Sequence, residues 1–341
     1  MTEEWPIASP GPAQADRPGD RALQRGGSRL STVTSDFFLD PVERLTEQER
    51  ALMTAMLHDL IGSIADDLRV RLPDDLAQAC EVEEAELVGN LTRAGLLKSE
   101  ALIRALLKQA TTSGIADGAG GEGIKPLLHQ WAADDDSDVA AAAMALILAR
   151  SRAKDRFGRF SMDLNELARD ETERLVHAVA ATLAAHCAGP ADSALADAAA
   201  ELVERCGEQP RLEHASRRLA EALKAAGRLN HDLLVTLASR GEAALLAEVL
   251  ALKAQVRTTD AWELLTGGGS AFALLLRLAG QPRETAASVL VAGEASFALG
   301  DPAAAIERFD AVGEEQADAE RRRLTRPLAF RQAQEALDDH G

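Results

Sequence analysis

The chain has 341 residues, of which 46% are hydrophobic and only 3% aromatic, with no tyrosine. It carries 37 Lys and Arg against 55 Asp and Glu, and the formal net charge of −18 repels phosphate backbones and anionic lipid surfaces, so we expect no nucleic-acid partner. Ala, Leu, Glu and Arg, which are strong helix formers, dominate the sequence, so we predict an all-α protein.

The cysteines and the apolar runs bear on location. Cys80, Cys187 and Cys206 are odd in number and widely spaced, which is more typical of a reducing compartment than of a disulfide framework. The N-terminus lacks the basic start and apolar core of a signal peptide. Residues 139–149 form the longest apolar stretch, which is shorter than the roughly 20 residues that a membrane-spanning helix needs. We therefore expect a cytoplasmic protein without membrane insertion.

The N-terminal third divides into a tail and a helical subdomain. Residues 1–34 are rich in Pro and Gly and have no apolar period, which predicts a disordered tail. Residues 35–110 are predicted to form an N-terminal helical subdomain. Its first helix begins at Thr46, where the spacing of Thr46 and Glu49 is that of a capping box, and apolar residues at intervals of three and four continue to Pro73.

Glycines crowd residues 111–124, which predicts a linker or loop between this subdomain and a helical-repeat domain over 125–341. Asp134, Asp136 and Asp138 have the alternate spacing of a calcium loop. However, Val139 stands where that loop needs glycine, so we interpret the cluster as a helix start. Further on, short helical stretches separated by single glycines predict a HEAT-like or TPR-like α-solenoid of stacked antiparallel helix pairs.

Several segments resemble a known family. These are the run from Ser35 to Pro41 with residues 45–53, the run from Asp155 to Phe160 leading to residues 175–180, and the stretch from Leu233 to Leu290. Over about residues 35–330 the chain resembles an uncharacterised alphaproteobacterial family of HEAT-like helical proteins, catalogued as a domain of unknown function. The resemblance implies a helical-repeat fold and brings no catalytic residues.

His58 is a candidate phospho-acceptor. The string from Leu57 to Ile64 resembles the phospho-acceptor box of histidine kinases and histidine phosphotransfer proteins, and the helical period turns His58 away from the apolar stripe. The usual proline or asparagine of that box is missing at Gly62 and Ser63. The alternative interpretation is a solvated surface histidine.

A basic run is the second candidate site. It contains Arg150, Arg152, Lys154, Arg156 and Arg159, interleaved with Phe157 and Phe160. Such guanidinium groups could hold the phosphates of an anionic nucleotide such as a cyclic dinucleotide. The alternative is structural, because cations at a helix C-terminus offset its dipole while the two rings fill a core.

The sequence contains no other clear motif for a catalytic or metal site. The cysteines and histidines lack metal-ligand spacing, and no nucleophile or phosphate-loop motif is present, so we expect no metal, no cofactor and no enzymatic activity. The leading hypothesis is a non-enzymatic scaffold or adaptor that binds another protein, with a role in bacterial signalling. Histidine phosphotransfer through His58 and nucleotide sensing through Arg152 and Arg156 are the alternatives.

Overall fold

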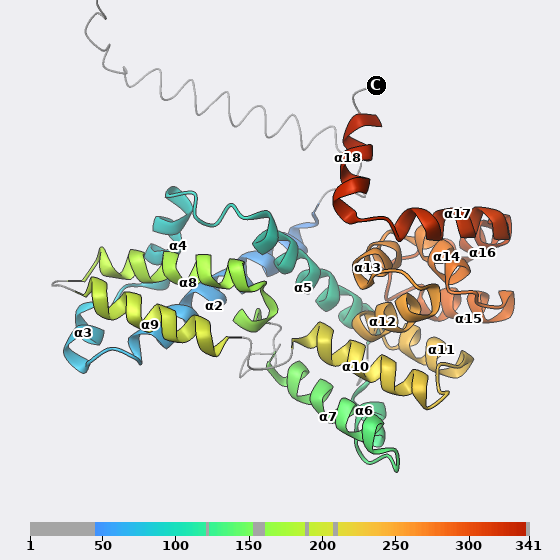
Figure 1. Cartoon of the computed structure of the whole chain (residues 1–341), viewed down its shortest axis with the longest axis horizontal. Coiled ribbons are helices and arrows are strands. Elements are labelled where there is room, and N and C mark those ends of the chain that lie inside the picture. Colours follow the sequence, from blue (N-terminus) through green and yellow to red (C-terminus); the bar gives the residue numbers. More distant parts are fainter. Residues whose placement is uncertain (1–44, 121–122, 153–160, 188–190, 207–210, 339–341) are drawn as a thin grey trace, which may run out of the picture. The chain divides into compact units, whose positions relative to one another are not determined.

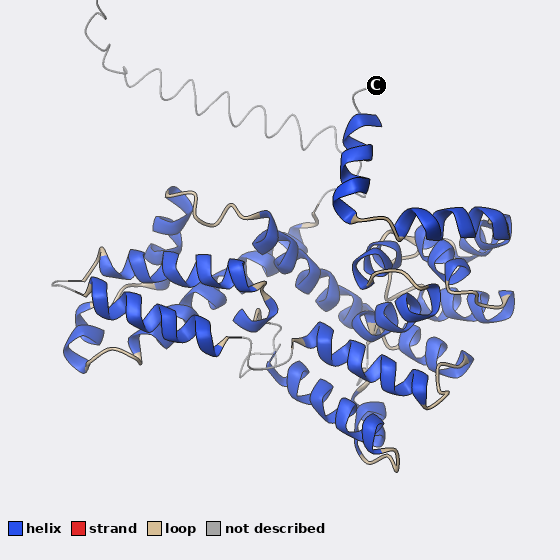
Figure 2. Ribbon diagram, in the orientation of Figure 1, coloured by secondary structure: helices blue, strands red, loops and turns tan. Residues whose placement is uncertain are grey.

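We describe the protein from a computed structural model that places residues 45–120, 123–152, 161–187, 191–206 and 211–338. These residues form seventeen α-helices and one short 3-10 helix, with no strand among them (Figure 2). The predicted all-α class is confirmed.

Figure 1 labels the helices along the chain. Their bounds, in chain order, are α2 (Glu47–Arg69), α3 (Asp74–Ala79), α4 (Glu84–Arg93), α5 (Glu100–Ala119), α6 (Lys125–Ala132), α7 (Ser137–Arg152), η1 (Leu164–Glu166), α8 (Arg169–Ala184), α9 (Asp192–Arg205), α10 (Leu212–Ala225), α11 (His231–Ser239), α12 (Ala243–Ala254), α13 (Thr258–Thr266), α14 (Gly269–Leu278), α15 (Arg283–Gly293), α16 (Pro302–Ala311), α17 (Glu314–Leu324) and α18 (Leu328–Asp338).

Contacts divide the chain into two units, residues 1–50 and residues 51–341. In the first unit, residues 45–50 contain the start of α2. The Glu49 N–H donates to Thr46 Oγ1 at 3.1 Å, and the Thr46 N–H donates to Glu49 Oε2 at 2.8 Å. These two bonds satisfy amides that lack helical partners, so the predicted capping box is confirmed. The predicted tail over residues 1–34 lies outside the described residues.

In the second unit, one hydrophobic cluster is built from two distant stretches of chain. Helices α2, α4 and the first half of α5 pack with α8 and α9, and α8 contacts both α4 and α9. On α2 the buried side chains recur every three or four residues, as in Met56, Leu60, Ile64 and Leu68. That period places them on one face of the helix, as the sequence predicted.

A disulfide bond between Cys80 and Cys187 joins the two stretches of this first cluster. Their Cα atoms lie 4.5 Å apart although 107 residues separate them in the sequence. The expectation of unpaired cysteines is thus corrected, because wide spacing in sequence does not prevent α3 and the end of α8 from meeting in the fold. Among the described residues Cys206 remains a free thiol, and burial raises the pKa of that thiol.

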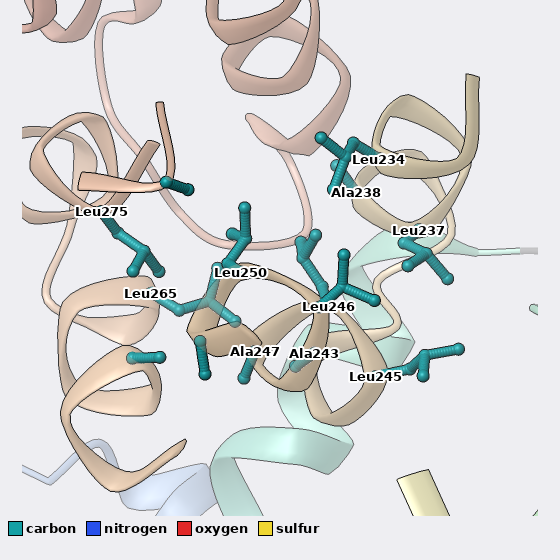
Figure 3. Packing of buried hydrophobic residues seen from close by; sticks show 14 of the residues in the cluster. Leu234, Leu237, Ala238, Ala243, Leu245, Leu246, Ala247, Leu250, Leu265 and Leu275 are labelled. Atoms are coloured by element: carbon teal, nitrogen blue, oxygen red, sulfur yellow. The ribbon is translucent and has the colours of Figure 1, made fainter. Parts of the chain in front are cut away.

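The second cluster contains α6, α7 and α10–α17, with α12 at its centre. Helix α12 contacts α5, α10, α11, α13 and α14, and its Leu245, Leu246 and Leu250 are fully buried. Figure 3 shows side chains of α11, α13 and α14, such as Leu234, Leu265 and Leu275, gathered around Leu246 and Leu250 of α12. Because this helix is apolar on nearly all sides, neighbouring helices surround it.

The prediction of a linker or loop over 111–124 is wrong for residues 111–119, which are helical. Helix α5 continues through Gly114 and Gly118 to Ala119. A Cβ atom on Gly118 would lie 3.1 Å from the carbonyl oxygen of Ala295, so this glycine permits a close helix approach. Tertiary packing therefore outweighs the roughly 1 kcal/mol that a helix-interior glycine costs. The same helix contributes Leu106 to the first cluster and Ile115 to the second.

One predicted helix start is confirmed, and a second helix start is capped in the same way. The Asp136 carboxylate accepts from the N–H groups of Asp138 and Val139 at 3.0 and 3.3 Å, so the acidic cluster does begin α7. Asp301 likewise accepts from the Ala303 N–H at 2.9 Å at the start of α16. No helix in the described part of the chain is long and apolar enough to cross a membrane.

Candidate binding cavity

A cavity of about 170 Å³ lies between α5, α10, α12 and α13. Met162 and Glu166, from the segment that leads into α8, also line it. Its wall combines charged, polar and apolar side chains, namely Ala105, Lys108, Gln109, Thr112, Met162, Glu166, Arg211, Leu212, Glu213, His214, Ala244, Ala247, Glu248, Thr258 and Trp262. A neighbouring hollow of about 310 Å³ shares Glu213, Glu248 and Thr258 with it.

Helical spacing explains how α12 and α13 shape this cavity. Ala244, Ala247 and Glu248 stand three and four residues apart and share one face of α12, while Thr258 and Trp262 stand four apart on α13. The two alanines leave room where longer side chains would fill the space. The same face of α12 thus presents a small apolar surface with a single carboxylate.

Lys108 of α5 holds one side of the cavity. Its Nζ donates to Glu213 Oε2 at 2.9 Å and lies 5.3 Å from the centroid of the Trp262 ring. The Trp262 ring face attracts that ammonium group through its quadrupole. This cation–π contact and the ion pair connect α5, α10 and α13, and they leave the Lys108 charge already neutralised.

Glu248 differs from the other carboxylates of the cavity because one of its oxygens is both buried and without a hydrogen-bond partner among the described residues. Its side chain is only 2% exposed, and Oε2 accepts from Thr258 Oγ1 at 2.9 Å. Oε1 is buried and has no hydrogen-bond partner among the described residues. Burial raises the pKa of Glu248 to about 7, although the Thr258 hydrogen bond acts in the opposite direction.

Glu166 is used inside the fold. Its Oε1 accepts from the Leu212 N–H at 2.7 Å and so satisfies an amide at the first turn of α10. Burial raises the pKa of Glu166, and the bond from Leu212 opposes that rise. Of the three carboxylates in the cavity, only that of Glu248 has an oxygen that is both buried and without a hydrogen-bond partner among the described residues.

His58 lies far along the chain from the residues of this cavity. It is on α2 with its side chain 34% exposed, and its Nδ1 lies 2.9 Å from Glu84 Oε1 of α4. The Glu84 carboxylate also lies over Gly62, where a Cβ atom would approach Oε2 to 3.0 Å. The imidazole is thus oriented by a neighbouring helix.

The described part of the basic run faces carboxylates. Arg150 forms an ion pair with Glu242. Burial raises the pKa of Glu242, and the nearby Arg150 charge opposes that rise. Arg152 Nε lies 3.4 Å from Asp163 Oδ2. Arg156 and Arg159 fall outside the described residues. The structure thus places Arg150 and Arg152 against anionic side chains of their own chain.

Sequence reasoning missed the cavity, since its members come from stretches more than 100 residues apart, such as Lys108 and Glu248. One signal was available. Glu248 is the only charged residue between Ala243 and Leu252, a run that is otherwise apolar. A charged residue in such a run is buried with the rest of the helix, and a buried carboxylate needs a partner.

The described residues define an all-α protein with a partly enclosed cavity whose wall combines polar and apolar side chains. Among the described residues, no group of three or more His, Cys, Asp or Glu side chains is placed to hold a metal ion. Residues 121–326 match the model of DUF2336, described as an uncharacterised protein conserved in bacteria. Because the match covers more than half of the chain, the protein belongs to that family. No curated protein and no solved structure matches the chain.

Proposed function

We propose that the protein is a non-enzymatic helical-repeat scaffold or adaptor that binds another protein in bacterial signalling. The arrangement of the second cluster supports a solenoid-like stack, because α10, α12, α14 and α16 each contact the next one in that series. A second row is less regular, with extensive contact between α11 and α15. We interpret the whole as a distorted HEAT-like or TPR-like stack in a cytoplasmic protein.

The observation that carries this proposal is the apolar stripe of α18. Phe330, Ala333 and Leu337 stand three and four residues apart, and the side chains of Phe330 and Leu337 are 52% and 74% exposed. Residues seven apart on a helix share a face, so this stripe is continuous. Such stripes fit the way an amphipathic helix enters a partner's apolar groove.

Helix α18 is nevertheless anchored to the rest of the chain. Arg331 is buried and forms an ion pair with Asp260 of α13. Asp260 also forms an ion pair with Arg257, whose Nε lies 3.0 Å from Asp260 Oδ2. Arg257 in turn donates to the Leu324 carbonyl at 3.2 Å, just before α18. Figure 1 shows α18 in red projecting beyond the end of α17. The anchor supports a role in which the stripe is held ready for a partner.

The test is capture of a partner from native lysate by the full-length protein and by the double variant Phe330→Glu/Leu337→Glu. We expect a saturable partner to be retained by the wild type and lost with the double variant. Gln316→Glu is the control, because it adds a negative charge at an exposed position of the neighbouring α17. Equal capture by all three proteins would contradict the proposed surface.

Histidine phosphotransfer through His58 is the second candidate, and the contact with Glu84 supports it. A carboxylate that accepts from Nδ1–H leaves the lone pair on Nε2, which is the nucleophilic nitrogen of a neutral imidazole. The protein would be incubated with bacterial histidine kinases and radiolabelled ATP. We expect label on the wild type and none on His58→Ala, and unlabelled wild-type protein would end this candidate.

A further inference from the structure

The cavity beside α12 has a chemistry that the proposed scaffold role does not use. Three carboxylates line it, those of Glu166, Glu213 and Glu248, against two permanent cations, Lys108 and Arg211. Glu166 is bonded to a backbone N–H and Glu213 to Lys108. His214 also lines the wall. Once the three carboxylates are ionised, this excess of negative charge in a partly enclosed space favours a positively charged occupant.

Glu248 indicates where the positive group would bind. Its side chain is 98% buried, and its Oε1 lacks any partner in the described structure while Thr258 serves only Oε2. A buried carboxylate oxygen without a donor costs free energy that a ligand N–H would recover. A charged N–H donor gives a stronger hydrogen bond with a carboxylate than a neutral donor does.

The remaining wall suits a small apolar body. Trp262 offers a ring and Ala244 and Ala247 offer methyl groups. The volume of about 170 Å³ exceeds slightly the roughly 150 Å³ of an engineered cavity that holds benzene. One six-membered ring with a short substituent therefore fits.

We propose that this cavity binds a small organic cation, whose protonated amine donates to Oε1 of Glu248 while its apolar part packs against Trp262 and the alanines of α12. The ammonium of Lys108 stays with Glu213, so the ligand does not need to displace it. This site belongs to the described part of the full chain and is distinct from the stripe of α18.

The experiment is calorimetric titration of the full-length protein at pH 8 with three probes of matched size. Benzylamine is cationic, benzyl alcohol is neutral and benzoate is anionic. We expect benzylamine to bind about tenfold or more tightly than benzyl alcohol, in line with one charge-assisted hydrogen bond, and benzoate to show no heat. Equal binding of all three would mean an apolar cavity without a cation site and would overturn the proposal.

Two variants locate the charge. Glu248→Gln should weaken benzylamine binding about tenfold, while Glu263→Gln, at an exposed position of α13, should leave it unchanged. Circular dichroism checks that each variant is folded, and if Glu248→Gln does not fold, the wild-type probe series still decides. Absence of heat with benzylamine up to concentrations on the order of 10 mM, or unchanged binding in a folded Glu248→Gln protein, would refute the site.

Discussion

Single residues in this protein show how burial sets chemistry. Glu248 lies on a helix whose other cavity-facing residues are alanines, and its burial is what raises the pKa of the carboxyl group to about 7. Glu242 is also buried, but it is paired with Arg150. Two buried carboxylates of α12 and its preceding turn therefore differ in whether the fold supplies a cation.

The raised pKa of Glu248 makes folding stability depend on pH. In the unfolded chain the group ionises near pH 4.5, whereas in the folded protein it holds its proton up to about pH 7. The free energy of unfolding should therefore fall as pH rises from about 5 to 8, by up to about 3 kcal/mol from this group, and then level off. Urea denaturation at pH 5 and pH 8 measures this fall.

Glu248→Gln should remove that share of the pH dependence, because an amide does not ionise. Glu166 and Glu242 remain in the variant, so the difference between the two proteins isolates Glu248. Glu263→Gln should keep the full wild-type fall. An equally steep fall in Glu248→Gln would show that the Glu248 pKa is not raised.

Individual helices depend on close approaches that only glycine permits. Gly241, in the turn before α12, has a φ of +61°, and a Cβ atom there would lie 2.6 Å from the Ile115 carbonyl oxygen of α5. Gly227, in the turn before α11, has a φ of +70° with no atom within 4 Å of that position. The two glycines share a backbone requirement but differ in packing.

We expect Gly241→Ala to destabilise the protein more than Gly227→Ala does. Both substitutions incur the roughly 1–2 kcal/mol of a left-handed backbone with a Cβ atom. Only the first forces α5 and the α12 turn apart, which should add about 1–3 kcal/mol. Thermal unfolding of both variants measures the difference, and equal melting temperatures would contradict the packing argument.

The sequence predicts an element correctly when the interactions that determine it are between neighbouring residues. The Thr46 and Asp136 helix starts depend on neighbours within three residues, so the sequence alone predicts them. The loop predicted at 111–124 was wrong up to Ala119 because the reason for Gly118 lies in a contact with Ala295. The cavity was missed for the same reason, since Lys108 and Trp262 meet only in the folded chain.

At the scale of the whole molecule, the Cys80–Cys187 disulfide links two residues that are 107 positions apart in the sequence. A cross-link across a loop of about 100 residues lowers the entropy of the unfolded chain and commonly stabilises a fold by about 2–5 kcal/mol. The cytoplasmic location that we propose would keep this pair reduced most of the time. The bond thus connects stability to the redox state of the surroundings.

Reduction of the Cys80–Cys187 disulfide with dithiothreitol should lower the melting temperature, because the unfolded chain regains the conformational entropy that the cross-link removes. The double variant Cys80→Ala/Cys187→Ala should melt like the reduced wild type and be insensitive to the reductant. Cys206→Ser should behave as the wild type does, because Cys206 takes no part in the bond. Titration of three free thiols in unreduced, denatured protein would contradict the disulfide.

Helix α5 has a practical consequence for anyone who shortens this chain. The family match begins at residue 121, directly after α5 ends at Ala119. A fragment cut at that point would lose Ile115 from its interior and the Lys108 wall beside Trp262. Fragments for expression should therefore begin upstream of α5. A fragment that begins at residue 121 lacks the contact between α5 and α12 and exposes apolar surface of α12 to water.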